Sequence, residues 1–208
     1  MLLKEFAVNY GKKKTFKKNK SFQLNSDQTL FYIKSGIVKL LYGNQKEQLA
    51  VDIYKEGEFF GYVDGICASD DCQLKAVFIE DTELICLDNE TVLDHSAINT
   101  DIRISFIRTV EKLLFDATAR IINLSILKKR ETIFTILHYL TTKFGKVLTN
   151  GKIMLKVKLN DTDLKELCHT SREYVNRTLS SLKEEGILEK ENGYFVFSSK
   201  EDLKRLIY

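Results

Sequence analysis

The hydrophobic pattern of the chain changes twice, and each change predicts a different kind of structure. Over the first 90 residues, β-forming residues occur in short runs that are broken by turn sequences such as Ser35-Gly36 and Gly43-Asn44. Runs of this length and spacing predict antiparallel strands that close into a roll, barrel or sandwich. The predicted strands cover residues 30–33, 36–42, 48–54, 76–79 and 82–87.

From residue 99 the apolar positions recur at steps of three and four, which is the period of an amphipathic helix. The pattern continues to residue 127, and a helix of this length is typical of pairing with a partner helix. A second helix follows and ends near Gly145. We expect a dimer interface on the long helix, formed by Phe106, Val110, Leu113, Leu114, Ala117, Ile121 and Leu124.

The last part of the chain, residues 152–208, predicts a short strand, two helices and a hairpin. Residues 153–159 alternate between apolar and mostly lysine positions, as in a half-buried strand. Asn160 and Ser171 are good N-caps for two successive helices, and Asn192-Gly193 is a strong signal for a tight hairpin turn. Two helices that are joined by a short turn and followed by a hairpin form a winged helix-turn-helix.

The second helix of this motif would enter the major groove of DNA, so its exposed side chains determine what it reads. Opposite an expected buried stripe of Val175, Leu179 and Leu182, we place the base-reading residues Arg172, Glu173, Asn176 and Arg177. Arginine forms two hydrogen bonds with guanine, and glutamate accepts one from cytosine. Phosphate contacts are expected from a second set: Thr170, Ser171, Thr178, Ser180, Lys183, Lys156 and Lys158.

The distribution of charge agrees with a DNA-binding end. The whole chain carries a formal net charge of only +3, but residues 128–208 hold 16 basic and 11 acidic residues, and residues 1–127 hold 16 and 18. The carboxy-terminal part is therefore basic and the rest slightly acidic. A cluster of lysines at residues 12–20 is interpreted as solvated surface.

Composition and motifs exclude several other classes of function. No apolar run approaches the roughly 18 residues that span a bilayer, and the charged start does not resemble a signal peptide. The four cysteines have neither the spacing of a disulfide framework nor that of a zinc site, and Cys86 and Cys168 are interpreted as packed thiols. There is no P-loop and no recognisable pair of nucleophile and base. We expect a cytoplasmic protein that is not an enzyme and holds neither metal nor cofactor.

Residues 164–179 read Leu-Lys-Glu-Leu-Cys-His-Thr-Ser-Arg-Glu-Tyr-Val-Asn-Arg-Thr-Leu. This segment resembles the helix-turn-helix of the Crp/Fnr family of bacterial transcription regulators, with its Ser-Arg-Glu-x-Val-x-Arg core intact. The turns at Gly36, Gly57 and Gly61 resemble glycine turns of the family's β-roll. The resemblance covers almost the whole chain and implies an α+β fold. It has an antiparallel β-roll of the cyclic-nucleotide-binding type (1–98), a long dimerisation helix (99–127) and a winged helix-turn-helix (128–208).

The resemblance also implies a way of acting. A homodimer would read a two-fold-related site on double-stranded DNA, with half-sites similar to TGTGA, and RNA polymerase is an expected partner. By resemblance, the family's arginine–glutamate–arginine base readers are Arg172, Glu173 and Arg177. His169 stands in the turn where the family often has glycine, and histidine tolerates the left-handed backbone that such a turn needs.

The chain departs from the family at the positions that hold a cyclic nucleotide. Tyr62 replaces the glutamate that holds the ribose, Leu74-Lys75 replace the Arg-Ser pair that holds the phosphate, and Ala117-Thr118 replace the Thr-Ser pair that contacts adenine. Because a cyclic phosphate is poorly held without the arginine, we expect any effector in a pocket of these five residues to differ from cyclic AMP.

Three alternatives stay open at this point. The protein is a regulator without an effector, a regulator that responds to oxidation of Cys67 and Cys72, or a ligand-binding module that does not act on DNA. No cysteine precedes Cys67, so an iron–sulfur cluster of the Fnr type is not expected, whereas haem stays open. The sequence does not separate an activator from a repressor.

Overall fold

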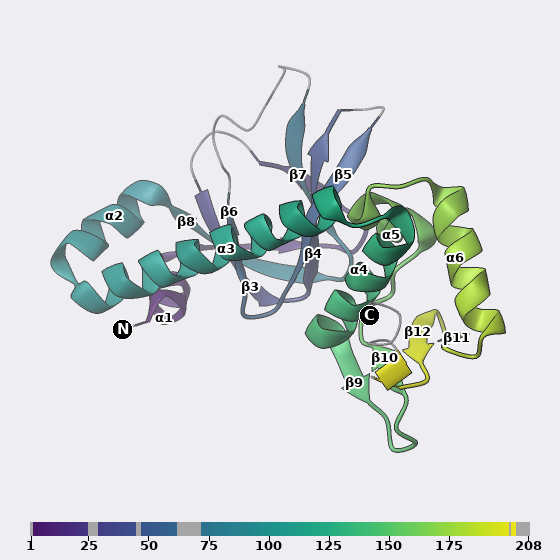
Figure 1. Cartoon of the computed structure of the whole chain (residues 1–208). Coiled ribbons are helices and arrows are strands. Elements are labelled where there is room, and N and C mark those ends of the chain that lie inside the picture. The colour runs from purple at the N-terminus through teal and green to yellow at the C-terminus, as the bar shows by residue number, and fades with distance from the viewer. Residues whose placement is uncertain (1, 25–28, 45–46, 62–71, 200, 203–208) are drawn as a thin grey trace. The chain divides into compact units, whose positions relative to one another are not determined.

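The computed structural model describes residues 2–24, 29–44, 47–61, 72–199 and 201–202. The chain divides into two compact units, Met1–Thr118 and Ala119–Tyr208, and the division falls within the long helix α3 (Figure 1). The helix predicted over residues 99–127 is therefore present, and it belongs in part to each unit.

The first unit contains two antiparallel sheets of four described strands each, with strand orders β1-β8-β3-β6 and β2-β7-β4-β5. Every strand predicted from the sequence of this unit is present. The elements are α1 (Leu3–Tyr10), β1 (Lys12–Phe16), β2 (Ser21–Gln23), β3 (Thr29–Ser35), β4 (Ile37–Gly43), β5 (Gln48–Lys55), β6 (Phe59–Gly61), β7 (Gln73–Phe78), β8 (Thr82–Asp88), α2 (Asn89–Ile98) and α3 (Thr100–Ile126).

Two apolar clusters hold this unit together. The first is rich in phenylalanine and lies between the two sheets, where the rings of Phe31 and Phe60 stack with centroids 5.0 Å apart. The second lies on the other face of the β1-β8-β3-β6 sheet, where α1, α2 and the start of α3 supply Phe6, Val92 and Ile102. The sheet is therefore buried on both faces, which explains why its strands read as apolar runs.

The elements that the sequence pattern did not predict include α1, α2 and β1. β1 contains Lys12, Lys13 and Lys14, all exposed, and pairs antiparallel with β8 at the edge of its sheet. An edge strand rich in lysine is common because the charges prevent pairing with other chains. The cluster interpreted as solvated surface is thus exposed, but half of it is a strand.

The second unit is a helix-turn-helix packed on a small sheet with strand order β11-β12-β10-β9. Its core contains Leu137, Leu155, Leu167 and Phe197, none of them more than 1% exposed. The elements that follow α3 are α4 (Lys129–Phe144), β9 (Gly145–Val147), β10 (Ile153–Leu155), α5 (Asp161–Cys168), α6 (Arg172–Glu184), β11 (Leu188–Glu191) and β12 (Tyr194–Phe197).

The strand predicted for residues 153–159 is shorter than expected, since only Ile153–Leu155 pair in the sheet. The alternation itself is confirmed, because Val157 and Leu159 are as buried as Ile153 and Leu155. The chain leaves the sheet after Leu155 and continues towards the N-terminus of α5, so the apolar positions face the core without a strand partner.

Candidate nucleic-acid interface

The turn between α5 and α6 is fixed by caps at both of its ends. Asn160 accepts hydrogen bonds from the backbone N–H groups of Thr162 and Asp163, at 2.8 and 3.0 Å, and so begins α5. His169 ends α5 in the left-handed conformation, with φ 49° and ψ 48°, as expected from the sequence. Ser171 then begins α6 by accepting a hydrogen bond from the N–H of Tyr174 at 3.2 Å.

The caps orient α6 so that one face is buried and the other is presented to solvent. Val175, Leu179 and Leu182 are buried, which confirms the predicted stripe, and Thr178 joins them. The predicted base readers Arg172, Glu173, Asn176 and Arg177 are all exposed and lie in the first two turns of the helix. The helix thus presents two guanidinium groups, a carboxylate and an amide together.

Two of these side chains are held in place in the free protein. The guanidinium of Arg177 lies 4.9 Å from the ring centroid of Tyr174, one turn earlier. Hydrogen bonds from the backbone N–H of Glu173 itself and from the hydroxyl of Ser171 lower the pKa of the Glu173 carboxyl, and the nearby charges of Arg172 and Lys165 lower it further. Glu173 is therefore an ionised acceptor near the N-terminus of α6.

The expected phosphate-binding residues fall into two groups. The side-chain oxygen of Thr170 is buried, and Thr178, only 7% exposed, donates its hydroxyl to the carbonyl of Tyr174 at 2.9 Å. Neither hydroxyl faces the surface. The residues of the set that the structure places at the surface are Ser171, Ser180, Lys183, Lys156 and Lys158.

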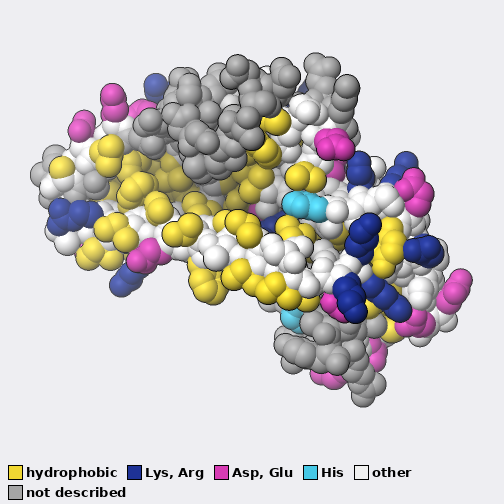
Figure 2. Space-filling model, turned by 45° about the horizontal axis from the view of Figure 1, so that its top comes forward, with side chains coloured by type: hydrophobic (Ala, Val, Ile, Leu, Met, Phe, Trp, Pro, Cys, Tyr) yellow, Lys and Arg dark blue, Asp and Glu magenta, His cyan; other side chains and the backbone are white. Residues whose placement is uncertain are grey.

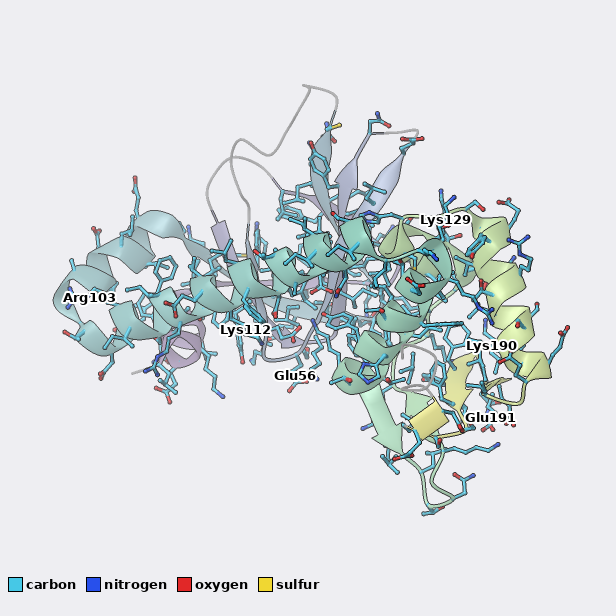
Figure 3. The ribbon with its side chains drawn as sticks, in the orientation of Figure 1. Glu56, Arg103, Lys112, Lys129, Lys190 and Glu191 are labelled. Atoms are coloured by element: carbon cyan, nitrogen blue, oxygen red, sulfur yellow. The ribbon has the colours of Figure 1, made fainter. Side chains whose placement is uncertain are left out.

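The β11–β12 hairpin forms the wing. Its turn at Asn192-Gly193 has positive φ at both residues, 51° and 87°, as the tight hairpin turn requires. Lys190 and Glu191 lie on this hairpin (Figure 3), and the Nζ of Lys158 lies 4.7 Å from the ring centroid of Tyr194. Two lysines, one on the wing and one in contact with it, therefore lie in the unit that contains α6.

The last turns of α3 contact the helix-turn-helix within the second unit. The Arg120 guanidinium donates a hydrogen bond to the carbonyl of Leu167, at 3.4 Å, near the C-terminus of α5. The neighbouring thiol of Cys168 is buried, and burial raises its pKa to about 12. Cys168 is therefore a packed thiol, and Cys86 is buried as well, as the sequence predicted for both.

The long helix α3 carries an exposed apolar face, and Figure 2 shows hydrophobic side chains gathered along it. Of the residues expected at a dimer interface, Leu114 and Ile121 are 66% and 64% exposed. Phe106 packs instead against the second apolar cluster of its own unit. The side chains of Val110 and Ala117 are exposed, and those of Leu113 and Leu124 are half-buried.

Four of the residues expected around an effector are described, and they lie on β7 and on α3. Leu74 belongs to the cluster between the sheets, together with Ala76 and Phe78. Because side chains alternate along a strand, Lys75 points to the opposite face of β7. Ala117 and Thr118 are exposed on α3. Tyr62 and Cys67 lie outside the described residues.

None of the described helices combines the length and the apolar character that a membrane span requires. Within the same residues, no group of three or more histidine, cysteine, aspartate or glutamate side chains is arranged to hold a metal ion.

Known proteins are similar to this chain in sequence. Residues 130–206 match the Crp-like helix-turn-helix domain. Over 180 residues the chain is 23% identical to the anaerobic regulatory protein of Bacillus subtilis (strain 168), a match that covers 86% of this chain and 75% of that protein. Residues 130–206 are thus a helix-turn-helix domain of the Crp type, with α5 and α6 as its two helices, and the chain as a whole resembles the Crp/Fnr transcription regulators.

Solved structures share the fold over nearly the whole chain. A CooA mutant from Carboxydothermus hydrogenoformans matches with a TM-score of 0.78 and 18% identity, covering 100% of this chain and 96% of that one. A transcriptional regulator of the CRP/FNR family from Thermus thermophilus matches with a TM-score of 0.69 and 19% identity, covering 94% of this chain and 98% of that one. The β-roll, the long helix and the winged helix-turn-helix are thus a fold that this chain shares with these proteins.

Sequence reasoning missed two residues near the interface. The motif assigns no role to Tyr174, although its position three residues before Arg177 is a signal for contact on one helix face. Arg120 carried no signal, because its bond to Leu167 joins residues far apart in the sequence.

Proposed function

We propose that the protein is a homodimeric, sequence-specific transcription regulator whose two α6 helices read the half-sites of a two-fold-related promoter sequence. The observation that carries the proposal is the exposed set of Arg172, Glu173 and Arg177 on a helix that is capped and backed by a buried stripe. Two arginines suit guanines, and an ionised glutamate suits the amino group of cytosine. Half-sites similar to TGTGA contain these bases.

The proposed dimer forms through α3. Ile107, Leu114 and Ile121 are seven residues apart, and all three side chains are at least 49% exposed. Val110, Ala117 and Leu124 repeat at the same interval three residues later, so the two series form the heptad seam of a two-stranded coiled coil. This seam differs from the interface predicted from the sequence. It includes Ile107, whereas Phe106 and Leu113 lie on a neighbouring face of α3.

In this proposal residues 1–98 are the effector or scaffold domain, residues 99–127 the dimerisation helix and residues 128–208 the DNA-binding domain. Ser171, Ser180, Lys183, Lys156 and Lys158 would contact phosphates, which position the protein on DNA without selecting a sequence. A protein with this task acts in the cytoplasm on the chromosome and works with RNA polymerase.

Any effector of the protein differs from cyclic AMP. No arginine precedes Arg103 in the chain, so the β-roll has none to bind a phosphate with two hydrogen bonds. Lys75 points away from the cluster between the sheets, and the neighbouring Leu74 fills that place with an apolar side chain. A regulator that is controlled by its abundance fits the same observations.

The test is genome-wide footprinting with the purified protein, followed by affinity measurements on the sites that it protects. We expect Arg172→Ala to weaken binding to a protected site by about 30-fold or more, because each lost pair of hydrogen bonds costs about 1–3 kcal/mol and a dimer loses two. Binding to unrelated DNA should change little.

Arg103→Ala is a matched control, because Arg103 is an exposed arginine at the start of α3, far in sequence from α6 (Figure 3). It should bind as wild type. Equal affinity and selectivity of Arg172→Ala and wild type would contradict the proposal. Footprints without any shared half-site would favour the alternative that the helix-turn-helix is only a scaffold.

A further inference from the structure

Glu173 and Arg177 stand one helical turn apart, with the acid on the N-terminal side. This is the arrangement in which exposed helices form ion pairs most readily. In α6 the two charges remain apart. The backbone N–H of Glu173 and the Ser171 hydroxyl lower the pKa of the Glu173 carboxyl, and Arg177 lies over the ring of Tyr174. Within the part of the chain that the structure describes, the two side chains form no ion pair with each other.

Tyr174 is well placed to hold Arg177 in this way. Its N–H donates to Ser171 and its carbonyl accepts the hydroxyl of Thr178, so the backbone on both sides of the ring is fixed by side chains. The tyrosine itself is half-buried, and the guanidinium carbon of Arg177 lies 4.9 Å from its ring centroid. An aromatic face attracts a guanidinium and gives it one preferred orientation.

We infer that Tyr174 is a positioning residue that keeps Arg177 away from Glu173, so that both remain available to read bases. The inference rests on the proposed function of α6. If Arg177 paired with Glu173, this ion pair would have to break at each half-site before either group could bind a base. Only then could the guanidinium bind guanine and the carboxylate accept a hydrogen bond from cytosine. The stacked arrangement removes that step and reduces the rotamer freedom that is lost on binding.

The first experiment uses the free protein and does not depend on DNA. Tyr174→Leu and Tyr174→Phe are compared with wild type by NMR. In wild type and in Tyr174→Phe, the ring should shift the Nε–H resonance of Arg177 upfield. In Tyr174→Leu this shift should disappear, and Arg177 should approach the Glu173 carboxylate. The pKa of Glu173, already lowered, should then fall further, because a nearby positive charge favours the ionised form.

The second experiment measures affinity for a site found by footprinting. Tyr174→Leu should weaken binding by about two- to fivefold per half-site, which corresponds to the strength of an exposed cation–π contact. The loss should concentrate at the base pair that Arg177 reads, and substituting that base pair should cost the variant less than it costs wild type. Tyr174→Phe keeps the ring and should retain wild-type affinity.

Tyr139→Leu serves as the matched control. It removes a tyrosine whose ring lies 5.3 Å from the Nζ of Lys143, but on α4 rather than on the recognition helix. This control should leave both DNA selectivity and the pKa of Glu173 unchanged. An unchanged Arg177 resonance and an unchanged Glu173 pKa in Tyr174→Leu would overturn the inference, whatever happens with DNA. Failure of the wild-type protein to select any DNA would instead overturn the proposed function and leave the NMR result to stand alone.

Discussion

The β-roll and the winged helix-turn-helix differ in what stands at the positions proposed to bind a ligand. In the second unit Arg172, Glu173 and Arg177 stand exposed at the proposed reading positions. In the first unit the positions compared with a phosphate site contain Leu74, which is packed between the sheets, and Lys75, which points to the opposite face of β7. The second unit thus presents polar side chains at its proposed site, whereas the first uses one of these positions for packing.

The difference shows that the two functions depend on different kinds of position. The proposed reading residues are exposed, so they contribute little to the stability of their unit. A ligand-holding residue inside a roll occupies space that the core can use. Burying a leucine there stabilises the fold by about 1.5–3 kcal/mol. A roll that binds no cyclic nucleotide can therefore remain folded and even gain stability. A recognition helix without its base-reading side chains would instead lose selective binding to DNA.

The largest expected effect comes from breaking the helix that the two units share. Leu114→Glu places a charge at the centre of the proposed seam, where it would face its own copy in the partner. We expect a monomer that binds a full two-fold site about 10²- to 10⁴-fold more weakly, because the two half-sites are no longer bound together. Analytical ultracentrifugation and DNA titration measure the two consequences.

Two controls separate dimerisation from folding. Lys112→Glu introduces the same side chain at an exposed position of α3 outside the heptad seam (Figure 3), and Leu114→Met keeps an apolar side chain. Both should remain dimeric. If Leu114→Glu sedimented as a dimer with full affinity for DNA, the seam would lie elsewhere. The exposed apolar face of α3 would then need another explanation.

A smaller effect, on the free energy of unfolding, is expected from replacing residues that have a left-handed backbone. Such a replacement can be made in each of the two units. Each unit contains a non-glycine residue with positive φ, Asn19 at 63° and His169 at 49°. Valine is strongly disfavoured in this conformation, so Asn19→Val and His169→Val should each lower the free energy of unfolding by about 1–2 kcal/mol in urea titrations. His169→Asn should be tolerated.

The two variants should differ in their effect on DNA. His169 ends α5 and sets the direction of α6, so His169→Val should also weaken selective binding by the folded protein. Asn19 lies between β1 and β2, and Asn19→Val should leave DNA affinity unchanged. Equal losses of selectivity in both variants would contradict the expectation that His169, and not Asn19, sets the direction of α6.

The sequence predicted best those features that depend on local chemistry. The caps at Asn160 and Ser171, the left-handed His169 and the turn at Asn192-Gly193 each involve groups only a few residues apart, and each is present. The edge strand β1 could not be predicted, because its lysines carry no apolar alternation and its position depends on pairing with β8. The direction of Lys75 could have been found, since apolar residues alternate with it along the strand.

The last prediction is that cyclic AMP has no effect on stability, and it tests the first unit most directly. A ligand at 100 times its dissociation constant stabilises a folded protein by about 2.7 kcal/mol, which raises the midpoint of thermal unfolding by several degrees. Cyclic AMP at about 1 mM would reach that ratio for a receptor with a dissociation constant of about 10 µM. We expect no shift, because the described part of the roll offers a phosphate no arginine, and Lys75 faces away from the cluster between the sheets. DNA affinity should be equally insensitive to the nucleotide. A clear rise of the midpoint together with tighter DNA binding would show that the first unit has kept a cyclic-nucleotide site built from other residues, and the contrast between the two units would disappear.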